Sequence, residues 1–346
     1  MGIESLKFTN KILLIFAITL ALYILKVLSF IFVPLAFACF IAIMLLPFMR
    51  WASKQKLNRY LALALAMLSL VVILYAGFQI IKLSGQEVLE GRAELFEKLD
   101  AKVGNAIEPY VQMLDIKVKT DDGLIKGLIY ESNLTKTIAS IVGPGLIHIK
   151  NFLTSLAITI FFLVLILAGS INFKVILQET LFNRPAQVLD VFVRIETSIS
   201  KFVSVKILTS LITGVLFSVI CWIFGVSFPL LWGVLAFCLN FIQMLGSIFV
   251  TILVSLMALV DIDQTGMLIA AICLFIAVQT MVGSVLEPIL MGKSFKINIV
   301  MVLIMLLFWG FLWGVAGMML AVPMAVLIKI LCEQFEPTQG FAKIMS

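Results

Sequence analysis

Long apolar runs, separated by short polar segments, dominate this chain. A helix that crosses the hydrocarbon core of a bilayer needs about 20 predominantly apolar residues. Six runs predict one crossing each, and they cover residues 12–28, 30–48, 60–81, 152–170, 207–224 and 265–282. The pattern therefore predicts an all-α integral membrane protein with a single polytopic transmembrane domain over residues 1–346.

The apolar run 226–260 is too long for a single crossing and has polar residues at its middle. These are Asn240, Gln243, and Ser247 beside Gly246. The run predicts a re-entrant helical hairpin that turns at this point, because such a hairpin enters and leaves the bilayer on one face. Two full crossings would fit the apolar pattern equally well.

The last apolar run, residues 299–331, is also too long for one crossing. It contains Gly310, Gly314 and Gly317, which have the spacing of small residues at close helix contacts. We expect this run to cross twice and to turn near Gly314. The whole pattern then amounts to about eight transmembrane helices plus one re-entrant hairpin.

Three polar segments set the expected orientation. Residues 50–59 carry four basic residues and no acid, so the positive-inside rule places them and both termini in the cytoplasm. Residues 82–150 then form a small extracytoplasmic helical insert. Residues 171–206 form a cytoplasmic amphipathic segment, with apolar side chains on one helical face.

Composition agrees with lipid as the main solvent. The chain has 346 residues, of which 62% are hydrophobic and 13% charged, whereas soluble domains have about a quarter of their residues charged. The net charge of +6 fits cytoplasmic loops, and no basic block with interleaved aromatic residues is present. We therefore expect a lipid bilayer as a partner and no nucleic acid.

Residues for catalysis or metal binding are scarce. His148 is the single histidine, and the five cysteines form no CxxC pair, so we expect no metal site and no disulfide framework. The sequence has no GxxxxGK[ST] motif for ATP. We expect no catalytic residues and no cofactor, and Gly-rich helix faces favour a homo-oligomer.

Glu287, directly before Pro288, is the main candidate for a transport path. A carboxylate inside a bilayer costs about 2.5–3.5 kcal/mol, and a proline frees backbone carbonyls that can bind a cation. In the alternative interpretation Glu287 lies among lipid headgroups, where it pairs with Lys293 or caps a helix. Gly292 follows as a candidate hinge or packing residue.

The polar residues of the 226–260 run are the second group of path candidates. The amides of Asn240 and Gln243 lie three residues apart on one helical face, where they either line a hydrophilic path or bond across helices. Ser247 beside Gly246 serves either close packing or ligand contact. Packing is also the favoured role of Gly310, Gly314 and Gly317, with a hinge as the alternative.

Three segments together resemble the signature blocks of the autoinducer-2 exporter (AI-2E) family of bacterial membrane proteins. They read "FGVSFPLLWGVLAFCLNFIQMLGSI", "LEPILMG" and "LLFWGFLWGVAGMMLAVPMAVLIKI". The resemblance implies an inner-membrane transporter, because members are linked to export of autoinducer-2 or to sodium or lithium antiport against protons. The family usually has a proline where this chain has Gln243, so the turn is kinked less sharply or the additional amide lines a path.

The expected function is therefore export of a small polar molecule, such as an autoinducer-2-like compound, coupled to a proton or sodium gradient. The main alternative is a cation/proton antiporter or channel-like pathway with no organic substrate. An assembly protein that docks through residues 82–150 and a membrane-embedded enzyme are the remaining alternatives.

Overall fold

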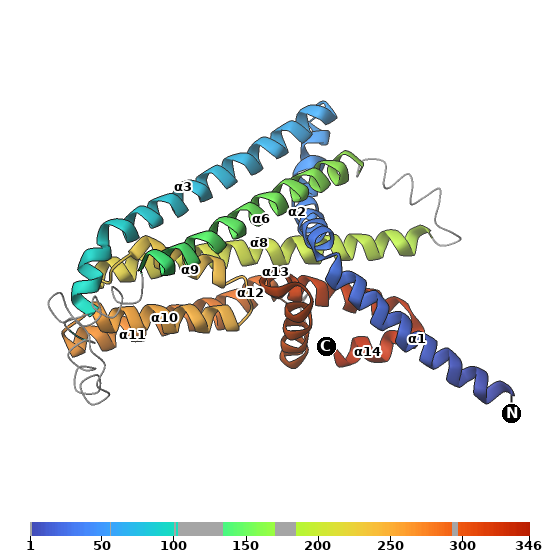
Figure 1. The fold of residues 1–346 in the computed structure, drawn as a ribbon. Helices are drawn as coiled ribbons and strands as arrows, with labels where there is room; N and C mark the ends of the chain where they lie inside the picture. The colour runs from blue at the N-terminus through green and yellow to red at the C-terminus, as the bar shows by residue number, and fades with distance from the viewer. Residues whose placement is uncertain (1, 56, 100–101, 103–133, 170–184, 293–296) are drawn as a thin grey trace. The chain divides into compact units, whose positions relative to one another are not determined.

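The computed structural model describes residues 2–55, 57–99, 102, 134–169, 185–292 and 297–346 (Figure 1). Every regular element in these ranges is helical, which confirms the predicted all-α class. The long helices are α1 (Gly2–Val27), α2 (Ser29–Lys54), α3 (Arg59–Leu99), α6 (Leu134–Gly169), α8 (Pro185–Phe224) and α13 (Ile299–Gln334). The shorter ones are α9 (Pro229–Leu239), α10 (Leu245–Asp261), α11 (Thr265–Thr280), α12 (Glu287–Met291) and α14 (Gln339–Ile344).

Seven continuous helical stretches in the described ranges are long and apolar enough to cross a membrane. The six long helices each contain one, and the seventh is Thr265–Met291, which runs from α11 through α12. The expected number was about eight, and the difference lies in the last apolar run. That run forms one helical element, α13, although its backbone leaves helical geometry at Gly314, with φ 62° and ψ −143°. The chain thus remains a multi-pass helical protein with one element that is sharply bent.

The bend in α13 reverses the direction of the chain. A Cβ atom on Gly317 would collide with the carbonyl oxygen of Trp309, eight residues earlier. In a straight helix these residues would lie about 12 Å apart along the axis. The predicted turn near Gly314 is therefore present, and Gly310 and Gly317 allow the two arms to pack closely. That each arm crosses the bilayer stays a prediction.

The chain divides into two compact units. The first comprises Met1–Ala66, Leu153–Val203 and Lys293–Ser346, and the second comprises Met67–Phe152 and Ser204–Gly292. The first unit contains a small core of Ala36, Phe40, Ile199 and Leu320, and an ion pair between Arg50 and Glu196.

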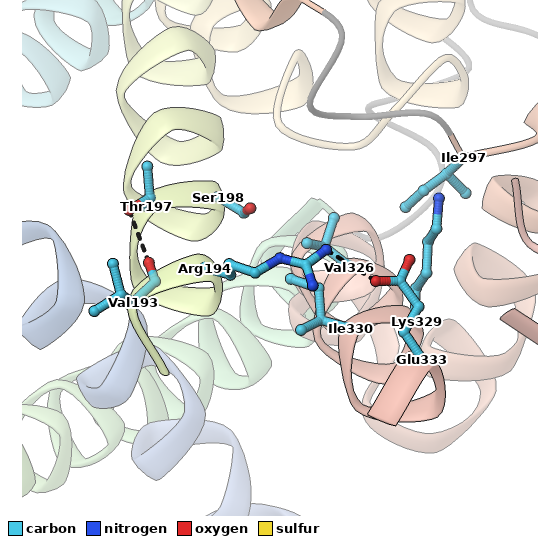
Figure 2. A pocket seen from close by; sticks show the side chains of 9 residues that line it. All are labelled: Val193, Arg194, Thr197, Ser198, Ile297, Val326, Lys329, Ile330 and Glu333. Atoms are coloured by element: carbon cyan, nitrogen blue, oxygen red, sulfur yellow. Dashed lines mark hydrogen bonds and ion pairs between the residues drawn. The ribbon is translucent and has the colours of Figure 1, made fainter. Parts of the chain in front are cut away.

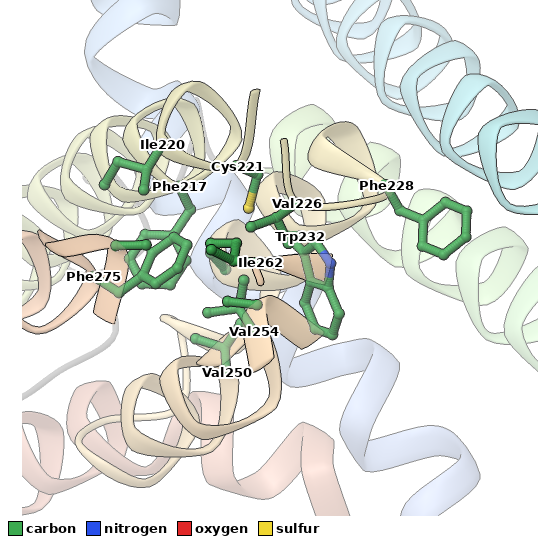
Figure 3. Packing of buried hydrophobic residues seen from close by; sticks show 13 residues of the cluster. Phe217, Ile220, Cys221, Val226, Phe228, Trp232, Val250, Val254, Ile262 and Phe275 are labelled. Carbon is green, nitrogen blue, oxygen red and sulfur yellow. The ribbon is translucent and has the colours of Figure 1, made fainter. Parts of the chain in front are cut away.

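A larger apolar core holds the second unit together (Figure 3). Phe217 on α8 and Phe275 on α11 are fully buried, with ring centroids 5.1 Å apart. Val250 and Val254 on α10 complete the cluster from another helix, and α10 packs against both α9 and α11. This core fixes the short helices α9 and α10 against α8 and α11.

Helices α9 and α10 form a tight hairpin. A Cβ on Gly246 would lie 2.7 Å from the carbonyl carbon of Leu239, seven residues earlier, so the chain reverses between the two helices. Helix α9 has 11 residues and is about 16 Å long, too short to cross a hydrocarbon core of about 30 Å. This length disfavours two full crossings, and a re-entrant position in the bilayer stays a prediction.

Several expected boundaries differ from the observed ones. Helix α3 continues past residue 81 to Leu99, and α6 runs without interruption through Gly143-Pro144-Gly145 to Gly169. Helix α8 unites the later part of the amphipathic segment with the predicted span 207–224. Residues 103–133 of the predicted insert lie outside the described residues, and the extracytoplasmic and cytoplasmic assignments stay predictions.

The close contact at Gly246 predicts that Gly246→Ala destabilises the protein by about 1–3 kcal/mol, because the hairpin must open to admit a methyl group. Gly266→Ala is the matched control, since no atom lies within 4 Å of a Cβ at that position. Thermal unfolding in detergent should show a lower Tm for Gly246→Ala alone. Equal Tm values for the two variants would contradict the tight turn.

Candidate functional site

A buried ion pair lies at the centre of the second unit. The Lys206 ammonium is 3.0 Å from both carboxylate oxygens of Glu287. The two side chains are only 3% and 4% exposed. Two charges in such apolar surroundings are tolerated only when they are paired with each other and hydrogen-bonded. The pair thus links α8, which carries Lys206, to the first residue of α12.

Gln243, in the turn between α9 and α10, completes the hydrogen bonds of the pair. Its amide oxygen accepts a hydrogen bond from the Lys206 ammonium at 3.0 Å. Its amide nitrogen donates to Glu287 Oε1 at 3.3 Å. The tip of the hairpin is therefore bonded to both charged groups. These three side chains, Lys206, Gln243 and Glu287, are called the polar triad below.

A second set of hydrogen bonds lies beside the polar triad. Asn240 donates from Nδ2 to the Ser210 hydroxyl at 3.1 Å, and its Oδ1 accepts a hydrogen bond from the Ser247 hydroxyl at 2.9 Å. All three side chains are buried. Both ends of the Asn240 amide are thus satisfied, as a buried amide requires. The bonds join the two ends of the hairpin turn to each other, and Asn240 joins the turn to α8.

Small residues allow α8 and α9 to approach closely enough for these bonds. A Cβ on Gly214 would lie 2.7 Å from the carbonyl oxygen of Gly233, and a Cβ on Gly233 would collide with the Ser218 hydroxyl. The Ser218 hydroxyl in turn donates to the carbonyl of Pro229 at 2.9 Å. Close backbone contact between these helices therefore brings the hairpin turn within reach of short side chains on α8.

The backbone around Glu287 is irregular. Residues Met281–Leu286 form a π-helical turn, and single π turns of this kind often occur at functional sites. Pro288 then occupies the first turn of α12, where its missing N–H is tolerated. Gly292 ends this helix with φ 62° and ψ −161°, a conformation that a residue with a Cβ rarely adopts.

Most of the predicted path residues come together in this unit. Asn240, Gln243, Ser247 and Glu287 all belong to the two sets of hydrogen bonds, and Gly246 shapes the turn that carries them. Their role in a transport path stays a prediction.

The predicted glycines of the last apolar run belong to α13, in the first unit. Glu287 is buried and paired with Lys206, which differs from the interpretation that places it among lipid headgroups. Lys293, its expected partner in that interpretation, lies outside the described residues.

Sequence reasoning missed Lys206 and Ser210 as site residues. Lys206 was counted only among the basic residues of the amphipathic segment. The signal was available, because the buried face of α8 continues through polar positions. The buried residues on this helix include Ile199, Phe202, Lys206, Ser210, Thr213 and Phe217. Burial of a lysine and of hydroxyl residues at i, i+3 and i+4 positions of an apolar face costs free energy unless these side chains form hydrogen bonds or ion pairs.

A second ionic cluster ties the far end of the hairpin to α3. Asp261 has a fully buried side chain that accepts hydrogen bonds from Lys98 at 3.0 Å and from the backbone N–H of Ser227 at 2.7 Å. Asp261 is therefore a buried anchor for neighbouring segments and not part of a solvated turn. Hydrogen bonds with Glu94 and Asp261 raise the pKa of Lys98 against the opposing effect of burial. The exposed Asp263 pairs with Lys102, which lowers the pKa of its carboxyl.

The polar triad has a clear chemical capability. Three oxygens, two from Glu287 and one from Gln243, surround one cationic nitrogen at 3.0 Å each. Protonation of the carboxylate, or another cation in place of the ammonium, would change the bonds of the hairpin turn. The hydrogen bonds of the hairpin turn therefore depend on which charges occupy this site.

Comparison with known proteins points to one family. Residues 12–336 match the family described as AI-2E family transporter. The chain is 26% identical over 326 residues to the AI-2 transport protein TqsA of Escherichia coli. This aligned region covers 91% of this chain and 89% of that protein. A Haemophilus influenzae protein, named in general terms for transport, is 24% identical over 348 residues, or 99% of this chain and 97% of the relative. A Borreliella burgdorferi protein is 29% identical over 192 residues, only 55% of this chain and 53% of the relative.

The burial of the ion pair predicts a large coupling between its two members. Glu287→Gln or Lys206→Gln alone should each destabilise the protein by about 3–5 kcal/mol, because each leaves an unpaired buried group. The double variant should cost clearly less than the sum of the single variants. Thermal unfolding of the four proteins in detergent provides this comparison.

The exposed pair Lys102–Asp263 is the matched control for that cycle. Lys102→Gln and Asp263→Asn should have nearly additive effects, because solvent screens a pair whose carboxylate is 90% exposed. Any cost of Lys102→Gln should come from its bonds to the carbonyls of Leu259 and Ile262. Additive effects for Lys206 and Glu287 as well would show that their pairing contributes little to stability.

Proposed function

Since the chain belongs to the AI-2E family of transporters, we propose that it exports a small polar molecule from the bacterial cytoplasm and couples this export to a proton or sodium gradient. The main support is the polar triad, a buried carboxylate paired with a buried ammonium at the tip of a helical hairpin. Ionisable residues inside membrane segments commonly mark ion or proton pathways. The similarity to the Escherichia coli AI-2 transport protein TqsA favours an autoinducer-2-like substrate.

The coupling site in this proposal is Glu287. Binding of a proton or a sodium ion there releases the Lys206 ammonium from the carboxylate. Gln243 then loses one or both of its bonds to the pair, and the hairpin turn becomes free to move against α8. Release of the ion on the other side restores the ion pair. The conformational change is thus driven by the difference in ion affinity between the two states.

We further propose a multi-pass arrangement in the bacterial inner membrane with both termini in the cytoplasm. The basic residues of segment 50–59, with no acid among them, support this orientation through the positive-inside rule. Close contacts through small residues favour a homo-oligomer, because such faces also suit contacts between helices of different copies.

A cation/proton antiporter with no organic substrate is the second candidate. The specific support is the position of the Lys206 ammonium, which lies where three oxygens converge. A small monovalent cation needs the same kind of oxygen-rich environment. In this candidate the lysine is a resident cation that the transported ion displaces.

The experiment is ion flux in proteoliposomes loaded with a pH-sensitive dye. A sodium jump should produce proton movement with the parent protein. The flux is measured once with and once without an autoinducer-2-like compound on the loaded side, so that its dependence on the compound can be compared. Glu287→Gln should reduce the signal to the level of protein-free liposomes. Asp263→Asn, which removes an exposed carboxylate from the same unit, should leave the flux unchanged.

Lys206→Gln distinguishes an ion site from a structural ion pair. If the ammonium occupies the cation position, its removal lowers the sodium concentration needed for half-maximal flux. A purely structural pair would instead give less flux with no gain in sodium affinity. Dependence of the flux on the organic compound separates the exporter from the antiporter, and parent-like flux in Glu287→Gln would rule out both forms of the proposal.

A further inference from the structure

A hollow of about 370 Å³ lies in the first unit, between the early part of α8 and the late part of α13 (Figure 2). It is lined by Val193, Arg194, Thr197, Ser198, Ile297, Val326, Lys329, Ile330 and Glu333. Neither the fold nor the proposed coupling site uses these residues. The hollow therefore needs an explanation of its own.

The lining combines cations and hydroxyls with apolar walls. Arg194 and Lys329 contribute two positive charges against the single carboxylate of Glu333. Ser198 adds a hydroxyl group from α8, whereas the Thr197 hydroxyl donates to the carbonyl of Val193 at 2.7 Å. Valine and isoleucine side chains form the rest of the lining. Such a lining suits a ligand that carries an anion on an apolar body.

Arg194 retains most of its donors for such an anion. Its Nη2 donates to Glu333 Oε2 at 3.0 Å, and the two side chains are 50% and 33% exposed. A guanidinium has five N–H donors in a planar fork that matches phosphate oxygens. The Ser198 hydroxyl bonds to no other described residue and is free to donate as well. Glu333 thus acts as an internal anion that accepts from only some of the N–H donors of Arg194.

The position of the hollow along the helices indicates its depth. Arg194 lies near the start of the apolar span Asp190–Phe224, and Glu333 lies at the end of the apolar span Ile299–Gln334. Both helices therefore present the ends of their apolar stretches to the hollow. The phosphates of a bilayer lie just beyond its hydrocarbon core, so the end of an apolar stretch is a suitable place for a phosphate ligand.

We infer that this hollow binds a phosphate group, with Arg194 as the main phosphate ligand, Ser198 as an additional donor, and Glu333 as the competing internal anion. The apolar walls and the depth favour a membrane phospholipid as the source of the phosphate. A small phosphorylated solute offers the same chemistry without the acyl chains. The site lies wholly in the first unit, so it is independent of the ion coupling proposed for Glu287.

The test is native mass spectrometry of the full chain, purified in a neutral detergent and titrated with three probes. Dioleoylphosphatidylglycerol presents phosphate and acyl chains, dioleoylglycerol presents the chains alone, and glycerol 3-phosphate presents the phosphate alone. We expect dioleoylphosphatidylglycerol to bind most tightly. Arg194→Gln should weaken this binding about tenfold, the range expected for a charged hydrogen bond.

Glu333→Gln should act in the opposite direction and tighten binding, because it removes the competing carboxylate. This opposite sign separates a binding role from general damage, since an unfolded variant would only lose affinity. Lys201→Gln is the matched control for Arg194→Gln, because Lys201 is a basic residue on the same helix, α8, that does not line the hollow. Its affinity should equal that of the parent chain.

Three results would overturn the inference. One is equal binding of dioleoylglycerol and dioleoylphosphatidylglycerol, another is equal loss in Arg194→Gln and Lys201→Gln, and the third is unchanged or weaker binding in Glu333→Gln. Tight binding of glycerol 3-phosphate that depends on Arg194 would support the phosphate site and identify a solute as its source.

Discussion

The need to pair charges in apolar surroundings controls the architecture of the second unit. Lys206 and Glu287 are 81 residues apart in the sequence, and each would be expensive to bury alone. Their pairing fixes α12 against α8, and Gln243 then fixes the hairpin turn against both. Electrostatics thus determines which segments of this unit meet, while the apolar cluster around Phe217 and Phe275 supplies the bulk of the packing.

Backbone features make this pairing geometrically possible. The tight turn at Gly246 carries Gln243 to the ion pair, and the close contact between Gly214 and Gly233 draws α9 against α8. The π-helical turn at Met281–Leu286 and Pro288 after it interrupt the regular hydrogen-bond pattern on either side of Glu287. Irregular backbone at membrane depth is tolerated where protein surrounds it, and such positions are common in transporter cores.

Sequence alone predicted the helical membrane class and the positions of both reversals. The length of an apolar run indicates a membrane span, because the hydrocarbon core tolerates only backbone whose N–H and C=O groups are hydrogen-bonded, as in a helix. Glycine or amide residues within runs that are too long for one span mark the turns at Gly246 and Gly314.

The partner of Glu287 could not be predicted, because it depends on tertiary packing between α8 and α12. In the sequence, Lys206 has the surroundings of a lysine in an ordinary amphipathic helix, which would lie at the membrane interface. Asp261 was missed for the same reason, since its partners Lys98 and Ser227 come from distant segments. The periodic pattern of a helix shows which face is buried, but not what that face meets.

Gln243 shows how one side chain changes the character of such a site. A proline at this position would have no side-chain donor or acceptor. With proline at this position, Lys206 and Glu287 would have only each other, and the hairpin tip would touch the pair through apolar contact. Gln243 instead supplies a third oxygen to the ammonium and a donor to the carboxylate. The glutamine therefore ties the hairpin turn directly to both charged groups of the pair.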